Sequence, residues 1–281
     1  MSNNIELVKI ATQVRRDIVR MVHGAKNGHP GGALGCTDLF VLLYFKLMKH
    51  NTTFSMDGKG EDLMFLSNGH ISAVWYSTLA RAGYFDVKEL ATHRKLNSRL
   101  QGHPTPHEHL PGIRIASGSL GQGLSAAAGA ALAKRLNGDL DTFIYCLMGD
   151  GEQQEGQVWE AAMFAPHHKT DNLIAIVDYN GQQIDGSTNK VLNLIDLGKK
   201  YEAFGWQVFS CNGNDMQDLE NTLLKAQKQK GTGIPAVIIM KTEMGYPIDF
   251  MMGTHKWHGV APNDEQKDKA LAQLEVTLGD Y

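Results

Sequence analysis

The chain has 281 residues, of which 42% are hydrophobic and 20% charged, and its formal net charge is -3. This length and composition are typical of one large globular domain, and the slightly acidic balance gives no basic surface for nucleic acid. No stretch reaches the roughly 18 apolar residues of a membrane span, the amino terminus lacks a secretion signal, and three scattered cysteines support neither disulfides nor a zinc cluster, so we expect a cytoplasmic protein.

Apolar residues repeat with helical and strand periods along the chain, separated by short turns. A loop at 93–111 is rich in Pro and His and lacks periodicity, which is typical of a functional loop. In chain order, the predicted elements before the loop are a helix within 1–27, a helix at 39–47, a strand at 63–66 and a helix at 71–82. After the loop comes a helix at 120–136, and a last helix lies at 263–278. Between these two, strands and helices alternate, starting with a strand: 142–148, 154–165, 172–178, 196–204, 206–210, 215–229 and 235–241. This order predicts one α/β domain over residues 1–281, a doubly wound parallel sheet with helices on both faces.

A polar motif follows each of two predicted strands. Gly149-Asp150-Gly151 comes after the apolar run 143–148, and Asn180 comes just after the run 172–178. In open α/β sheets, ligands bind beyond the carboxyl ends of the strands, where helix amino termini favour phosphate. Carboxylate and amide oxygens are ligands for a hard cation. The pattern therefore predicts a metal-diphosphate site, and its structural alternative is a pair of turns that end two strands.

Seven short motifs rich in Gly and His follow one another along the chain: GHPGGALG at 28–35, LSNGH at 66–70, QGHP at 101–104, GSLGQG at 118–123, GDGEQQEG at 149–156, DYNGQQIDG at 178–186 and THKWHG at 254–259. In this order they resemble the amino-terminal part of the transketolase family. The resemblance covers nearly the whole chain. It implies a thiamine diphosphate-binding fold of the PP type, with thiamine diphosphate and Mg²⁺ as cofactors. The implied reaction transfers a two-carbon ketol unit from a ketose phosphate to an aldose.

The resemblance also implies which residues hold the cofactor. It assigns Mg²⁺ to Asp150, to the side chain of Asn180 and to the main-chain carbonyl of Gln182. The Gly118 carbonyl and the Leu120 backbone would receive the aminopyrimidine, and Ile184 would support the thiazolium ring. The cofactor-binding residues expected in full are His70, Gly118, Leu120, Gly149, Asp150, Gly151, Glu152, Asn180, Ile184 and His258.

The resemblance assigns family positions to four of the twelve histidines: His29, His70, His103 and His258. Imidazole exchanges protons near neutral pH and hydrogen-bonds sugar hydroxyls and phosphates. By resemblance, His29 and His258 handle the substrate carbonyl and hydroxyls, His103 contacts the first hydroxyls of the sugar, and His70 and His258 approach the diphosphate. Structural roles are expected for other histidines, such as His23, His93, His107, His109, His167 and His168.

Glu155 lies at the start of the helix that follows the Asp150 motif. By resemblance it is a catalytic residue that meets its counterpart at a subunit interface and joins the network that activates the cofactor. Because the helix is otherwise apolar, we expect Glu155 to be buried and paired. The glycines at 118–123 match a dinucleotide-binding fingerprint only loosely and follow no predicted strand, so a Rossmann site is disfavoured.

The resemblance implies a partner chain. Full transketolases are more than twice this length, and their second half supplies the Glu that activates the cofactor. We therefore expect a split enzyme, an α2β2 heterotetramer in which a separate C-terminal transketolase subunit provides the pyrimidine-binding and carboxy-terminal domains. The substrates are expected to be sugar phosphates.

Two alternatives stay open at this point. The α subunit of a 2-oxoacid dehydrogenase decarboxylating component shares the Asp150 and Asn180 pair and a split architecture, but its reaction needs no histidines to hold sugar hydroxyls. A noncatalytic subunit that keeps the fold is the second alternative. It is disfavoured by the intact residues Asp150, Asn180, His29, His103 and His258.

Overall fold

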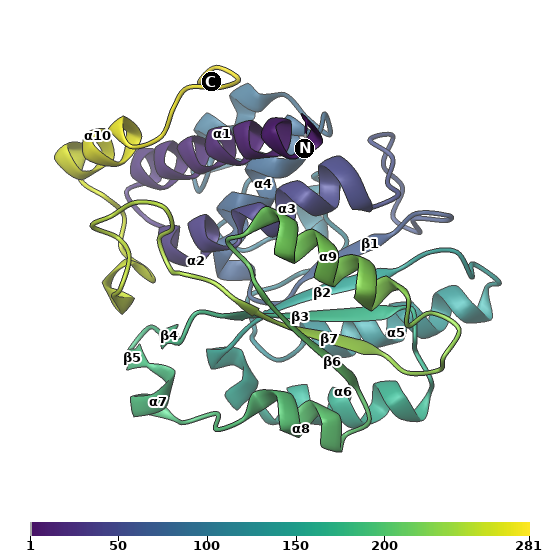
Figure 1. Cartoon of the computed structure of the whole chain (residues 1–281). Coiled ribbons are helices and arrows are strands. Elements are labelled where there is room, and N and C mark those ends of the chain that lie inside the picture. Colours follow the sequence, from purple (N-terminus) through teal and green to yellow (C-terminus); the bar gives the residue numbers. More distant parts are fainter. Residues whose placement is uncertain (1) are drawn as a thin grey trace.

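Five parallel strands form the central sheet, in the order β1-β2-β3-β7-β6 (Figure 1). The computed structural model describes residues 2–281, with side chains from Ile5 onward, and Met1 falls outside the described residues. The strands are β1 (Leu63–Leu66), β2 (Ile144–Gly149), β3 (Leu173–Tyr179), β6 (Gln207–Asn212) and β7 (Ala236–Lys241), with a separate antiparallel hairpin of β4 (Gln182–Gln183) and β5 (Gly186–Ser187). The parallel α/β sheet predicted from the sequence is confirmed.

The central strands are apolar runs because both of their faces are covered. Along β2, Tyr145 and Leu147 point into one hydrophobic core, while Ile144 and Cys146 point into the other. The strand register pairs Gly149 at the end of β2 with Asp178 near the end of β3. The polar motifs that follow the two strands are therefore brought to the same edge of the sheet.

Helices cover both faces of the sheet, as predicted. One core joins the sheet to α1, α3, α4 and α9, and the other joins it to α5, α6 and α8 (Figure 1). The helices are α1 (Ser2–Ala25), α2 (Pro30–Gly35), α3 (Thr37–Leu42), α4 (Ser72–Arg81), α5 (Gly123–Leu136), α6 (Gly156–His167), α7 (Thr188–Val191), α8 (Leu197–Ala203), α9 (Met216–Gln227) and α10 (Asp264–Ala272). None of these helices, nor any other in the described part of the chain, is long and apolar enough to cross a membrane.

The differences from the sequence prediction lie at element ends. The helix predicted at 120–136 begins only at Gly123, because Gly118 and Gly121 adopt positive φ angles that hold the preceding residues in a loop. The helix predicted at 39–47 continues as a π-helical turn after Leu42. The short elements α2, α7, β4 and β5 were not predicted. Three of them, α2, β4 and β5, carry or flank residues of the candidate site.

Candidate functional site

A cavity of about 330 Å³ lies at the carboxyl edge of the sheet. It is bounded by segments that follow β1, β2 and β3, by the start of α2 and by the segment before α10. The predicted site residues that line it are His29, His70, Gly118, Leu120, Gly149, Asp150, Gly151, Glu152, Glu155, Asn180, Gln182, Ile184 and His258. His103 is the one predicted site residue outside this lining, and its ring centroid lies 6.4 Å from that of His29. The structure therefore gathers the predicted residues, while their individual roles stay predictions.

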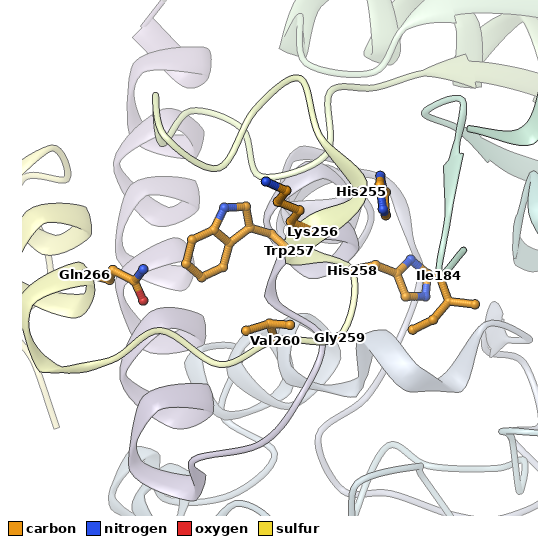
Figure 2. A pocket seen from close by; sticks show the side chains of 8 residues that line it. All are labelled: Ile184, His255, Lys256, Trp257, His258, Gly259, Val260 and Gln266. Carbon is orange, nitrogen blue, oxygen red and sulfur yellow. The ribbon is translucent and has the colours of Figure 1, made fainter. Parts of the chain in front are cut away.

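A second cavity, of about 530 Å³, adjoins the first. The two share Ile184 and His258 as lining residues. Figure 2 shows the segment 255–260 running along this second cavity, with Gln266 of α10 at the far side. The exposed side chains of Ile184 and Val260 make part of its wall apolar. The site is thus an open groove that leads from the sheet edge toward α10.

The candidate metal ligands are held together by backbone donors. The carboxylate of Asp150 accepts hydrogen bonds from the N–H of Gly151 (2.7 Å) and the N–H of Gly181 (2.6 Å). The Asn180 side chain donates to Asp178 (2.9 Å) and accepts from the N–H of Gln182 (2.9 Å). These contacts fix the amide orientation of Asn180 and bring it beside Asp150.

Two buried carboxylates, those of Asp150 and Asp178, lie at this edge of the sheet. Burial, and next the charge of Asp178, raises the pKa of Asp150 to about 7. Burial likewise raises the pKa of Asp178, although Thr242, Cys36 and Asn180 donate hydrogen bonds to it. Within the described residues, no Lys, Arg or His forms an ion pair with either carboxylate. A divalent cation would supply the missing positive charge, so these residues fit the Mg²⁺ that the sequence predicts.

The donor set is mixed rather than a cluster of strong ligands. Among the described residues, no group of three or more His, Cys, Asp or Glu side chains is arranged to hold a metal. One carboxylate, one amide oxygen and one main-chain carbonyl suit a cation that keeps water and phosphate oxygens in its coordination shell. Asn68 adds a polar atom, because its buried Oδ1 has no hydrogen-bond partner in the described chain and the residue lines the same cavity. The motif at 66–70 was the only sequence signal for Asn68.

Four histidines converge on one side of the cavity. Ring centroids of His29 lie 5.0 Å from His70 and 5.7 Å from His258, and those of His70 and His258 lie 5.0 Å apart. His29, His70 and His258 come from three distant segments, in order the start of α2, the 3-10 turn after β1 and the segment before α10. His103 approaches from the loop at 93–111.

The imidazoles are held in the neutral form. Burial, and next the nearby rings and Arg94, lowers the pKa of His29 to about 4. Burial also lowers the pKa of His70 and His258, and burial together with Arg94 lowers that of His103. A neutral imidazole has one donor and one acceptor nitrogen, and the buried Nδ1 of His29 has no partner in the described chain. The cluster can therefore both accept and return protons at neutral pH.

Glu155 is not buried in this chain. It occupies the N-cap position of α6, and its side chain is exposed although the residue borders the cavity. The expectation of a buried, paired glutamate was wrong for the single chain, because the apolar side of α6 is formed by Val158, Ala161 and Ala162 and leaves Glu155 outside. Glu155 still lies against the loop at 118–123, because a Cβ added to Gly121 would lie 2.9 Å from the Glu155 Cβ.

Glu152 is the buried glutamate of this motif. Its carboxylate accepts hydrogen bonds from the Ser67 hydroxyl, the N–H of Gly121 (2.7 Å) and the N–H of Gly149 (3.0 Å). These three donors belong to the segment after β1, to the loop at 118–123 and to the end of β2. The hydrogen bonds of Glu152 therefore link three segments that surround the cavity.

Replacing Glu152 with glutamine should loosen these loops. The amide has one acceptor oxygen, and its NH₂ group would face a backbone donor, so we expect a loss of about 1–3 kcal/mol of stability. Affinity for thiamine diphosphate should fall about 10-fold to 100-fold, as when an outer-shell partner is removed. Calorimetric titration beside thermal unfolding measures both, with Glu202→Gln on the exposed surface of α8 as control. Unchanged values for Glu152→Gln would contradict this role.

Comparison with known proteins identifies the family. The family model described as "Transketolase, thiamine diphosphate binding domain" matches residues 7–278. The chain belongs to this transketolase family. It is 38% identical over 270 residues to one of the subunits of an apulose-4-phosphate transketolase from Actinobacillus succinogenes, and the match covers 96% of each chain. It is 36% identical to the 6-deoxy-6-sulfo-D-fructose transketolase subunit SqwG from Clostridium sp. (strain MSTE9), covering 96% of this chain and 97% of that one.

Solved transketolases share the fold. The structure superposes on the transketolase from Leishmania mexicana with a TM-score of 0.89 and 32% identity, and on that from Campylobacter jejuni with 0.88 and 35%. These matches cover 95% of this chain but only 41% and 42% of the two longer proteins. The chain thus corresponds to the thiamine diphosphate-binding part of a transketolase, and it spans nearly the full length of relatives that are named as subunits.

Proposed function

We propose that the chain is the N-terminal subunit of a transketolase that depends on thiamine diphosphate and Mg²⁺. With a separate C-terminal subunit it would transfer a two-carbon ketol unit from a ketose phosphate to an aldose. The observation that carries the proposal is the joint geometry of the cavity, whose lining combines two buried carboxylates, which form no ion pair within the described residues, with three of the four converging histidines. A metal-diphosphate site beside neutral acid-base groups is what ketol transfer requires.

The proposed cofactor site uses the sheet edge. Asp150, the Asn180 side chain and the Gln182 carbonyl would hold Mg²⁺, with the remaining positions filled by phosphate oxygens and water. Gly149 and Gly151 line the cavity and carry no side chain, so a diphosphate has room to approach the backbone there. When bound, thiamine diphosphate supplies the stabilisation of a carbanion. The exposed Ile184 and Leu120 offer apolar contact for its two rings.

The histidines would act on the sugar. His29 and His103 are proposed to bind the hydroxyls of the ketose donor and to move protons at its carbonyl and hydroxyl oxygens. Their low pKa supports this role, because a neutral imidazole can accept a proton from a hydroxyl at neutral pH. His258 lines both cavities and is proposed to contact both the diphosphate side and the substrate.

A partner chain completes the proposal. The names of the relatives as subunits and the short coverage of full transketolases support a split enzyme. We propose that the present chain forms the thiamine diphosphate-binding domain as one unit, in an α2β2 assembly with the C-terminal subunit. The exposed Glu155 would then be covered by a second subunit and join the activating network. A cytoplasmic location is proposed from its three buried, unpaired cysteines.

Mixing the subunits tests the proposal. The chain alone should show no turnover of xylulose 5-phosphate with ribose 5-phosphate, whereas the mixture with its partner should be active, because the activating Glu is expected on the partner. The same mixture made with the Asp150→Ala chain serves as the inactive control. Full turnover by the chain alone would disprove the split architecture, and an inactive mixture of folded subunits would favour the dehydrogenase or noncatalytic alternatives.

A further inference from the structure

The Arg94 guanidinium connects two loops of the histidine cluster. One terminal nitrogen donates to the Asn27 side chain (3.2 Å), and the other donates to the carbonyl of Gly102 (3.3 Å). Asn27 lies two residues before His29, and Gly102 lies directly before His103. A single side chain therefore ties the end of α1 to the loop at 93–111.

The local backbone is built around this contact. Arg94 has a positive φ of 57°, and its N–H donates to the carbonyl of Leu100 (2.9 Å), which closes the loop on itself. A Cβ added to Gly102 would lie 2.7 Å from the Arg94 Cζ, so a side chain there would push against the guanidinium. On the other side, Ser72 of α4 donates to the Gly102 carbonyl (2.9 Å). Arg94 is thus packed in one defined place against the segment that carries His103.

The positive charge of Arg94 is not neutralised by a partner. Among the described residues, no carboxylate forms an ion pair with it. Its buried Nε has no hydrogen-bond partner in the described chain, and burial lowers the pKa of the guanidinium. If the contact between the two loops served only stability, a neutral side chain could make it without the cost of removing a charged guanidinium from water. The unpaired cation points to a role in the adjoining site.

We propose that Arg94 is a positioning residue, which sets the distance and orientation of His29 and His103. The inference rests on the proposed function for the role of these histidines in ketol transfer. Arg94 does not line the cavity, so it would act through the two histidines and not on the substrate. Its planar fork suits the task, because two donors in fixed geometry can hold two loops at once.

The charge of Arg94 acts on both imidazoles. It contributes to the low pKa of His29 and of His103, in each case after burial. The other titratable groups around them are His93, Tyr76 and Glu108 near Arg94, and His70, His258, Asp150, Glu152, Glu155 and Asp178 along the cavity. Removing the cation should therefore raise the pKa of His29 and His103, while burial keeps both below the ordinary histidine value.

Two variants separate geometry from charge. Arg94→Gln removes the cation, so the titration midpoints of His29 and His103, followed by NMR of histidine-labelled chain, should move upward. Arg94→Lys keeps the charge but loses the fork, so the midpoints should stay near wild type. In the complex with the partner subunit, both variants should lower kcat/KM for xylulose 5-phosphate about 10-fold to 100-fold, the scale of a small misplacement of reacting groups. The Kd for thiamine diphosphate should change less than about 2-fold, since the metal ligands are untouched.

Arg99 provides the matched control. It lies on the same loop, donates to Glu89 and the His109 carbonyl, and contacts none of the four clustered histidines, so Arg99→Gln should leave midpoints and kcat/KM unchanged. If Arg94→Gln fails to fold, Asn27→Ala, at an exposed residue, removes only the contact toward His29 and should still lower kcat/KM several-fold. Unchanged midpoints and unchanged kcat/KM in the folded variants would overturn the proposal. An inactive wild-type complex would instead refute the proposed function, and the midpoints would still decide the effect of Arg94.

Discussion

Replacing Asp150 with alanine is expected to abolish Mg²⁺-dependent binding of thiamine diphosphate. Asp150 is the only carboxylate of the proposed ligand set, and without it the diphosphate would meet a site whose metal is no longer held. We expect the affinity to fall by more than about 100-fold, beyond the range for removal of an outer-shell partner. Asn180→Ala should weaken binding less, because a neutral amide contributes less charge. Calorimetric titration of the complex with and without Mg²⁺ measures both.

Asp141→Ala is the control for this experiment. Asp141 is exposed near the opposite end of β2, so its removal changes the net charge equally without touching the cavity. Its cofactor affinity should match that of the unmodified chain. Unchanged affinity in Asp150→Ala would exclude Asp150 as a metal ligand, and the uncompensated charge at the sheet edge would then need another explanation.

Alanine at His29 or at His103 should lower kcat/KM by about 10²- to 10⁴-fold, the usual range for a positioned acid-base group, while cofactor affinity changes little. Both residues lie on loops apart from the metal motif. His258→Ala should behave differently and damage turnover and cofactor affinity together, because His258 lines both cavities. Steady-state kinetics at saturating thiamine diphosphate, beside a cofactor titration of each variant, separates the two patterns.

His107 is the matched control for the histidine variants. It lies on the same loop as His103, is exposed and lines neither cavity, so His107→Ala should keep normal kinetics. Near-normal turnover in both His29→Ala and His103→Ala would instead favour the dehydrogenase α subunit or a noncatalytic subunit. Those alternatives need the cofactor fold but no histidines that hold a sugar.

The sequence predicted the sheet well because buried parallel strands leave a clear apolar signal. β1 was predicted at its observed bounds, and β2, β3 and β7 were placed within one or two residues. The carboxyl ends of β2 and β3 then located Asp150 and Asn180 at one edge without further information. The convergence of His29, His70 and His258 depended on the family motifs, since nothing in periodicity brings those three segments together.

Contacts made by single side chains could not be predicted in the same way. The sequence did not indicate that the Glu152 carboxylate accepts hydrogen bonds from three separate segments, and its contact with the cofactor stays a prediction. Glu155 was expected to be buried because the helix that follows it is apolar. It is the N-cap residue of α6 and lies outside the apolar side of the helix, which helix periodicity does not show. Arg94 gave no signal at all. Its role depends on a positive φ angle and on a close approach to Gly102, both of which arise only in the folded loop.

The meeting of His29 and His258 has a consequence for synthesis on the ribosome. The first follows α1 near the amino terminus, and the second lies beyond β7, close to the other end of the chain. Local helices such as α1 and α4 can form early, but contacts between distant segments must wait for the last of them to emerge. A nascent chain that has exposed α1 through α9 therefore still lacks His258 and the wall that it gives to both cavities. The candidate site is completed only after the segment that follows β7 has left the ribosome.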